Sequence, residues 1–212
     1  MKSLALQDFL KNAQNGAKVI DIRETGAAVA AFIPDSILLS QSIDLDERLH
    51  YLPHFLEKDQ AFLLVGENEA DAQKYGEDLK KAGYSRCNGF LAGGFSAFQD
   101  SNERSEMLIV VSPFEVAVDH KFSENAAFWD IRKKADFESG SLKKAIHKEV
   151  EDIIFNEDEI EPFKTHYLFD EHGDGAACVA SILKGFRKHN FYLIENGFEG
   201  IRNSESMKDY LT

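Results

Sequence analysis

The segments "VIDIRE" (residues 19–24) and "FWDIRK" (residues 128–133) are the starting point for the architecture. In both, an apolar run typical of a buried strand ends in Asp-Ile-Arg, once in each half of the 212-residue chain. One short echo would be weak, but three further pairs of segments follow in the same order, which indicates a duplicated unit. These pairs are FIPDSILLS (32–40) with GSLKKAIHK (140–148), FLLVGENEADA (62–72) with HYLFDEHGDGAA (166–177), and LAGGFSAF (91–98) with IENGFEGI (194–201).

The seam between the two copies is QDSNERSEM (residues 99–107), which is polar and charged like a linker. The sequence therefore predicts two domains, residues 1–100 and residues 107–212. Within each copy, continuous apolar strand patterns alternate with helical patterns, which indicates a parallel sheet covered on both faces. We predict two tandem α/β domains, each with a mostly parallel central sheet and helices on both faces.

The expected elements follow the apolar runs. In the first copy we expect strands at 18–22, 37–39, 61–65 and 87–90, and helices at 4–10, 48–57 and 70–82, the last ending before Gly83. In the second copy we expect strands at 127–131, 166–169 and 191–194. The acidic segment NEDEIE (156–161) is expected to form a solvated turn and the start of a helix.

Composition limits the classes of partner and compartment. The formal charge of −13 comes from 24 basic and 37 acidic residues, which argues against nucleic acid as a partner. No apolar run approaches the length of a membrane span, and the N-terminal residues do not resemble a signal peptide. The two cysteines, Cys87 and Cys178, do not form a disulfide framework. We therefore expect a soluble protein in the reducing cytoplasm, with no membrane partner.

The repeated motifs resemble those of the rhodanese-like (thiosulfate sulfurtransferase) superfamily in its tandem two-domain arrangement. The resemblance rests on Asp-Ile-Arg after the early strand, on FIPDSI and GSLKKAI, and on the closing segments LAGGFSAF and FYLIENGFEGI. It implies that a cysteine after the central strand of each active domain accepts sulfane sulfur as a persulfide. It also implies that backbone N–H groups of a six-residue loop and the next helix favour that anion, with no cofactor.

The sequence departs from this pattern at the cysteine position of both copies. Gly66 opens the first loop (residues 66–71), and Asp170 opens the second (residues 170–175). Neither residue can form a persulfide, and neither loop contains Arg or Lys to attract an anionic donor. We expect no confident catalytic residue, and the remaining loop positions are candidates for ligand contact. They are Glu67, Asn68, Glu69, Ala70 and Asp71 in the first loop, and Glu171, His172, Gly173, Asp174 and Gly175 in the second.

Asp170 admits more than one role. Its carboxylate could take the place of the anionic sulfur and accept hydrogen bonds from the loop backbone. A weaker alternative is a divalent metal site formed by Asp170, His172 and Asp174. We also expect each Asp-Ile-Arg motif to form an ion pair or loop-anchoring hydrogen bonds, the alternative being contact with a ligand. Trp129 is expected in the core.

Three hypotheses for function follow. The first is a catalytically inactive tandem rhodanese-like protein that acts as a binding or regulatory module linked to sulfur metabolism, with a small anion or an unidentified protein as partner. The second is a sulfurtransferase that uses Cys87 or Cys178, although both are expected to be buried apolar residues without the positive surroundings that a thiolate needs. The third is a metal or anion site at the Asp170 loop.

Overall fold

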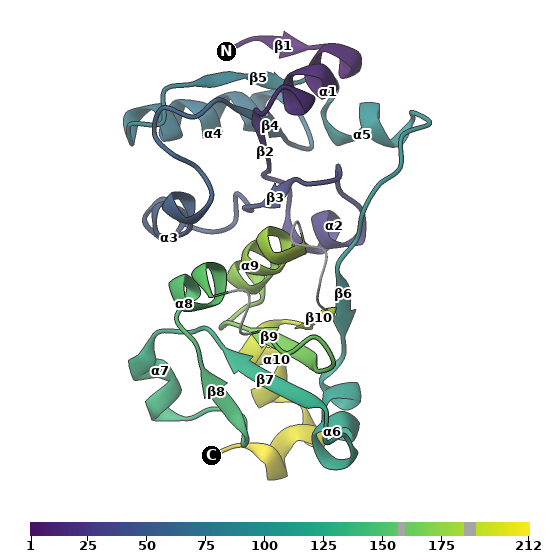
Figure 1. Cartoon of the computed structure of the whole chain (residues 1–212), viewed down its shortest axis with the longest axis vertical. Coiled ribbons are helices and arrows are strands. Elements are labelled where there is room, and N and C mark those ends of the chain that lie inside the picture. Colours follow the sequence, from purple (N-terminus) through teal and green to yellow (C-terminus); the bar gives the residue numbers. More distant parts are fainter. Residues whose placement is uncertain (157–159, 185–189) are drawn as a thin grey trace. The chain divides into compact units, whose positions relative to one another are not determined.

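The chain forms two compact units, Met1–Met107 and Leu108–Thr212. The computed structural model describes residues 1–156, 160–184 and 190–212 (Figure 1). Within the NEDEIE segment, residues 157–159 lie outside this described part, so the expected turn and helix start are not covered there. Each unit contains one five-stranded sheet, and the two units are described separately below.

The sheet of the first unit has the strand order β1-β5-β4-β2-β3, with every neighbouring pair parallel. Because parallel strands are joined by crossovers, helices lie between successive strands along the chain. The strands are β1 (Ser3–Leu4), β2 (Lys18–Asp21), β3 (Ile37–Leu38), β4 (Phe62–Val65) and β5 (Cys87–Leu91). The helices are α1 (Leu6–Gln14), α2 (Thr25–Ala30), α3 (Leu45–Tyr51), α4 (Glu69–Lys81) and α5 (Gly94–Gln99), with a 3₁₀ helix η1 (Leu52–His54) after α3.

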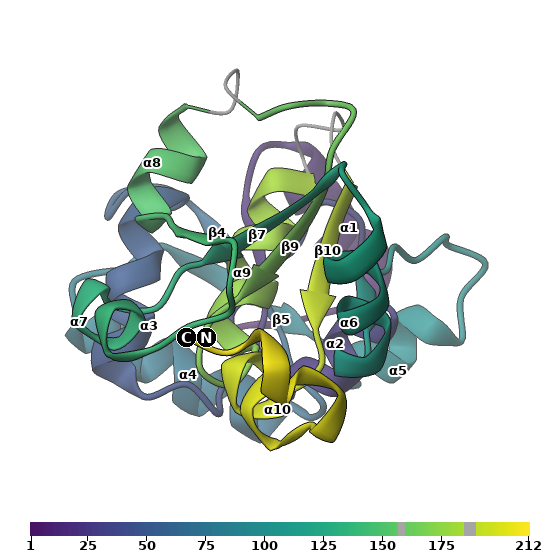
Figure 2. The ribbon, with the colours of Figure 1, turned by 90° about the horizontal axis from the view of Figure 1, so that it is seen from below.

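The second unit repeats this topology with the order β6-β10-β9-β7-β8, again with every neighbouring pair parallel. Figure 2 shows β7, β9 and β10 side by side, with α6 and α10 beside them. The strands are β6 (Ile109–Val111), β7 (Ala126–Asp130), β8 (Ala145–His147), β9 (Thr165–Phe169) and β10 (Asn190–Ile194). The helices are α6 (Pro113–Phe122), α7 (Lys134–Ser139), α8 (Val150–Phe155), α9 (Asp174–Lys184) and α10 (Gly197–Asn203), followed by the 3₁₀ helix η3 (Glu205–Tyr210).

Equivalent helices form equivalent cores in the two units. In the first, Phe9 of α1 and Phe95 of α5 pack with residues of β2, β4 and β5. In the second, Val116 of α6 and Phe198 of α10 pack with residues of β7, β9 and β10. Helix α9 packs on β9 and β10, and α4 packs on β4 and β5. The predicted duplicated α/β fold is confirmed, and Trp129 is buried as expected. Across the described part of the chain, no helix is both long and apolar enough to span a bilayer.

Some element boundaries differ from the sequence prediction. The expected helix at 4–10 is instead strand β1 followed by α1, which begins only at Leu6. The expected helix at 48–57 begins earlier, at Leu45, and tightens into η1 at Leu52. Pro53 accounts for the change from α-helix to 3₁₀ helix, because its ring nitrogen cannot donate the hydrogen bond that would continue the α-helix.

A tight turn with left-handed backbone precedes the edge strands β3 and β8. In the first unit the amide of Ser36 donates to the carbonyl oxygen of Ile33 at 3.0 Å, and Asp35 within this turn has φ of 62°. In the second unit Lys144 occupies the equivalent turn with φ of 64°. Since side chains disfavour this region, both residues hold a strained backbone that glycine would adopt freely.

Replacing Asp35 with glycine is therefore expected to raise the free energy of unfolding by up to about 1 kcal/mol, because relief of strain outweighs the added entropy of the unfolded chain. Urea denaturation of the full chain measures this change. The same substitution at exposed Asp46, in the right-handed backbone of α3, is the control and should lower stability by about 0.5–1 kcal/mol. Equal losses at both positions would show that Asp35 is not strained.

Candidate functional site

A buried ion pair fixes the end of the early strand in each unit. The Arg23 Nε and Nη2 atoms donate to the carboxylate of Asp21 at 2.7–3.1 Å, and the side chains are 3% and 0% exposed. Arg23 Nη2 also donates to the carbonyl oxygen of Ala31 at 2.6 Å. Burial raises the pKa of Asp21, while the hydrogen bonds and charge of Arg23 oppose that rise. The predicted ion pair is confirmed in this unit.

The second unit repeats the pair. Arg132 Nε and Nη2 donate to the carboxylate of Asp130 at 2.7–3.2 Å, and Nη2 also donates to the carbonyl oxygen of Gly140 at 2.8 Å. The hydroxyl of Ser141 at 2.7 Å and the backbone amide of Arg132 at 3.0 Å also donate to this fully buried carboxylate. Each Asp-Ile-Arg motif therefore has a structural role, because most hydrogen-bond donors of its arginine are bound to the neighbouring aspartate.

The same arginines also contact the last α-helix of each unit, α5 in the first and α10 in the second. The guanidinium carbon of Arg23 lies 3.4 Å from the ring centroid of Phe95, and that of Arg132 lies 3.7 Å from the ring centroid of Phe198. Stacking of a guanidinium on an aromatic face is favourable and orients both groups. The ion pair thus positions α5 and α10 relative to β2 and β7.

The closing helices in turn hold the two loops by their backbone. The amide of Phe95 donates to the carbonyl oxygen of Gly66 at 3.0 Å, and the amide of Phe198 donates to that of Asp170 at 2.8 Å. A Cβ atom at Gly197 would lie 2.5 Å from the carbonyl oxygen of Asp170, so only glycine permits this approach. The sequence signal for this contact is the glycine before phenylalanine in the repeated GGF and NGF segments, and the sequence analysis did not predict the contact from it.

In the first loop, the acidic residues have local partners. Asn68 caps α4 by accepting from the amide of Asp71 at 3.0 Å, and its own amide donates to the Asp71 carboxylate at 2.8 Å. The Glu69 carboxylate accepts from the hydroxyl of Ser3 at 3.1 Å and from the amide of Gly93 at 3.2 Å. Glu69, Ala70 and Asp71 thus belong to the first turn of α4, and the loop itself is shorter than the predicted 66–71.

Gly66 is the first residue of this loop and has no side chain that could react. A Cβ atom placed there would lie 3.0 Å from the carbonyl oxygen of Asn68, which is tighter than ordinary contacts. Glu67 is exposed beside it. The first loop therefore presents an acidic, closed turn with no reactive atom.

In the second loop, the carboxylate of Asp170 is held by backbone amides of its own loop. Its Oδ1 accepts from the amide of Gly173 at 2.7 Å, and its Oδ2 accepts from the amide of Gly175 at 2.9 Å. Burial raises the pKa of Asp170 to about 6, and the two amides pull it back down without offsetting the burial. The hydrogen bonds expected for a built-in anion are present.

Glu171, the next residue, lies between two arginines that the loop sequence does not contain. Its Oε2 accepts from Arg132 Nη1 at 3.2 Å, and its Oε1 lies 3.3 Å from Arg202 Nη2 of α10. These side chains border a cavity of about 520 Å³ together with Phe198. Positive charge therefore does reach this loop, from other elements, which corrects the expectation drawn from the loop residues alone.

The proposed metal set is not brought together. His172 is exposed and its Nδ1 lies 3.2 Å from the Glu199 carboxylate, while both oxygens of Asp170 face backbone amides. Asp174 is the first residue of α9. Among the described residues, Asp170, His172 and Asp174 do not form a group whose ligand atoms all lie within 4.8 Å of one another.

Neither cysteine has the surroundings of a nucleophile. Cys87 is the first residue of β5, and its Sγ lies 3.6 Å from the carbonyl oxygen of Gly89 in the same strand. Burial raises the pKa of its thiol to about 11. Cys178 is fully buried in α9, where burial and the charge of Asp170 raise the pKa of its thiol well above the usual range. Both thiols are therefore protonated near neutral pH.

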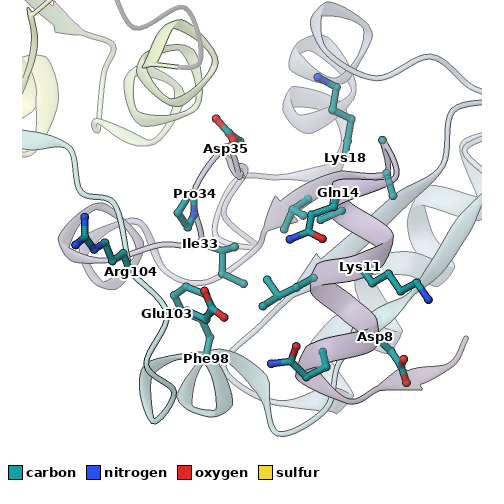
Figure 3. A pocket seen from close by; sticks show the side chains of 16 residues that line it. Asp8, Lys11, Gln14, Lys18, Ile33, Pro34, Asp35, Phe98, Glu103 and Arg104 are labelled. Carbon is teal, nitrogen blue, oxygen red and sulfur yellow. The ribbon is translucent and has the colours of Figure 1, made fainter.

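A larger cavity, of about 850 Å³, lies in the first unit away from the loop. It borders Lys18, which begins β2, whereas Gly66 follows the opposite end of the parallel strand β4. Figure 3 shows its side chains, in which Ile33 and Phe98 provide apolar contacts and acidic and basic groups are mixed. The charged groups of this wall are Asp8, Lys11, Lys18, Asp35, Glu103 and Arg104.

The fold and the loops define a class: a tandem α/β protein with a strand–loop–helix cradle after the central strand of each sheet. A family model described as the rhodanese-like domain matches the chain twice, over residues 6–101 and residues 115–204. Because these matches cover most of the chain, the protein belongs to the rhodanese family, as the sequence motifs predicted. No curated protein sequence matches it.

Several solved structures are similar to parts of the chain. A thiosulfate sulfurtransferase from Pseudomonas aeruginosa is 14% identical with a TM-score of 0.43, and the match covers 95% of this chain but only 42% of that protein. A protein of unknown function from Rhodopseudomonas palustris, described as a possible tyrosine phosphatase, is 18% identical with a TM-score of 0.41, covering 45% of this chain and 80% of that one. A rhodanese-related protein from Thermoplasma volcanium is 16% identical with a TM-score of 0.39, covering 43% and 87%.

The two arginines beside Glu171 should differ sharply in their effect on stability. Arg132→Met leaves the buried carboxylate of Asp130 without its partner, so we expect a loss of about 3–5 kcal/mol in the free energy of unfolding. Arg202 is half exposed, and Arg202→Met should cost less than about 1 kcal/mol. Chemical denaturation measures both values, and a small cost at Arg132 would contradict its role in the framework.

Asp170 should make stability depend on pH in a defined window. Its pKa is raised from 3.8 to about 6 in the folded state, so the folded protein binds a proton that the unfolded chain has released between these values. The free energy of unfolding should therefore fall as pH rises through this window, by roughly 3 kcal/mol in total. Asp170→Asn removes the titration and should flatten the curve, whereas Asp46→Asn should not. A wild-type curve parallel to that of Asp170→Asn would contradict the shift.

Proposed function

We propose that this protein is a catalytically inactive tandem rhodanese-like protein that acts as a binding or regulatory module. The observation that supports this most is that the Asp170 carboxylate accepts hydrogen bonds from the amides of Gly173 and Gly175. The anion site of the second loop is therefore filled by a carboxylate of the protein itself. An occupied cradle leaves neither the reactive atom nor the space that a persulfide needs. Gly66 leaves the first loop without a nucleophile.

The state of the cysteines supports the same proposal. Sulfur transfer through Cys87 or Cys178 would require a thiolate that a donor can reach. The raised pKa of both thiols and the complete burial of Cys178 oppose this route.

The cavity beside the second loop supports the proposed binding role. There Arg132 and Arg202 flank Glu171, and a carboxylate or another small anion could take over the Arg202 contact, since Arg202 is 52% exposed. The bound group would be a free anion or an acidic side chain of a partner protein. A link to sulfur metabolism rests on family membership.

A thiosulfate:cyanide sulfurtransferase assay of the purified chain tests the absence of catalysis. We expect no turnover above a thiol-free blank, and no gain of about 32 Da in intact mass after incubation with a sulfane donor. Asp170→Cys is the matched gain-of-function variant, because it places a thiol among amides already aimed at an anion. This variant should acquire the persulfide mass, while Gly66→Cys, whose Cβ meets the carbonyl oxygen of Asn68, should acquire less.

Turnover by the wild-type chain that disappears in a Cys87→Ala, Cys178→Ala double variant would overturn the proposal in favour of an unusual sulfurtransferase. Failure of Asp170→Cys to take up sulfur, with its fold intact by circular dichroism, would contradict the assignment of this loop as a preserved anion cradle.

A further inference from the structure

In the second unit, the segment that follows α10 packs back onto the core. Met207 of η3 is fully buried and belongs to the core cluster of this unit, and Tyr210 packs against the same cluster. The ring centroid of Tyr210 lies 4.5 Å from that of His120 on α6, and its carbonyl oxygen accepts from the amide of Lys143 at 2.7 Å. Helix η3 therefore covers the surface formed by α6, α10 and the turn before β8.

The strand registers allow the two units to be compared residue by residue. Leu4 of β1 pairs with Leu91, the first residue of the repeated segment LAGGFSAF. Val111 of β6 pairs with Ile194, the first residue of IENGFEGI. Leu4 and Val111 are therefore equivalent, and counting on from them aligns α1 with α6. With the other repeated segments, the equivalent pairs are Ala13 with His120, Val19 with Phe128, Ile33 with Leu142 and Phe98 with Ile201. The first member of each pair lines the large cavity of the first unit, whereas the second member is buried in the unit that η3 covers.

The segment after α5 in the first unit is shorter than its counterpart. It reaches its backbone pairing with Phe32 at Glu106, eight residues after Phe98. In the second unit the equivalent pairing is made by Thr212, eleven residues after Ile201. Since a 3₁₀ helix has three residues per turn, the first unit lacks one turn of backbone at this place.

The surface that η3 covers in the second unit is open in the first, where it forms the cavity of about 850 Å³. Residues 102–105 are exposed, and within residues 1–107, which the structure describes in full, no residue after Phe98 joins the core cluster. Figure 3 shows Ile33 and Phe98 between α1 and Arg104. The apolar floor of this cavity is therefore left without the two side chains that cover its counterpart.

We propose that the large cavity of the first unit is a docking site for a short helical segment of a partner protein. The segment carries two apolar side chains three residues apart, at least one of them aromatic, as η3 carries Met207 and Tyr210. Residues at this spacing lie on one face of a 3₁₀ turn, and a helix is commonly recognised by laying its apolar face into a groove. The site lies away from Gly66 and does not involve Arg202, so it goes beyond the anion contact proposed for the second loop.

The rim of the cavity favours a peptide over a strongly charged small molecule. Three of its charged residues are basic and three are acidic: Lys11, Lys18, Arg104, Asp8, Asp35 and Glu103. A ligand with a high charge of one sign would meet like charges on half of this rim. A peptide that carries both signs, as η3 does in ESMKDY, has partners on the whole rim. The volume also falls in the range of pockets that bind ligands.

An NMR titration of the ¹⁵N-labelled full chain tests the proposal. The probe is the peptide SESMKDY, which copies residues 204–210 and is acetylated and amidated at its ends. We expect saturable shifts of the amide signals of Lys11, Lys18 and Asp35, which border the cavity. The signal of His120 should not move, because the second unit keeps its own η3 in place. A peptide with serine at both apolar positions should bind at least about tenfold more weakly.

Substitutions in the floor of the cavity test where the peptide binds. Ala13→Trp fills the space beside α1 and should weaken binding at least about tenfold, and the milder Ala13→Leu should weaken it less. The matched control is Lys74→Trp on the exposed face of α4, which should leave the dissociation constant unchanged. Arg202→Met should also leave it unchanged, which separates this site from the anion contact in the second unit. Circular dichroism checks that each variant folds.

Four outcomes would overturn the proposal. They are the absence of shifts at millimolar peptide, shifts confined to the surroundings of His120, and binding that is insensitive to Ala13→Trp. The fourth is an equal response to p-cresol alone, which would make the cavity a site for small apolar molecules instead of a peptide helix.

Discussion

The buried pair of aspartate and arginine at the end of β2 and β7 is the interaction on which the rest of each unit depends. Removing two charges from water is costly unless both are fully hydrogen-bonded, and here Arg23 and Arg132 are held by a carboxylate, a carbonyl oxygen and an aromatic ring at once. Each arginine therefore joins the early strand to the closing helix. Because that helix donates its first amides to the loop, the ion pair also sets the shape of the loop.

This arrangement separates the fold from the chemistry. The ion pair and the glycine turn constrain the loop through backbone atoms, so the side chain at its head is free to change. Gly66 and Asp170 stand at equivalent points of two loops with the same support, one with no side chain and one with a carboxylate. A change of the residue at this point therefore has little effect on the framework, which explains how two unlike loops can share one scaffold.

The sequence alone predicted the parts that local patterns determine. Apolar runs located the strands, and the recurrence of Asp-Ile-Arg located the duplication and the ion pairs. It did not reveal that Arg202 reaches Glu171, because these residues lie on elements joined only by tertiary structure. It also missed β1, a strand of two residues whose pairing with β5 is entirely long-range. The start of α4 was misplaced because Asn68 caps the helix inside the expected loop.

The second loop balances two opposing effects on one carboxylate. Burial disfavours the charge of Asp170, while the amides of Gly173 and Gly175 favour it, and the result is a pKa of about 6 rather than a strongly acidic group. Glu171 adds negative charge next to it but is neutralised by Arg132 and Arg202. The two arginines beside Glu171 are therefore unequal: Arg132 is held in the buried pair with Asp130, whereas Arg202 is half exposed, so its contact with Glu171 can change without disturbing the buried pair.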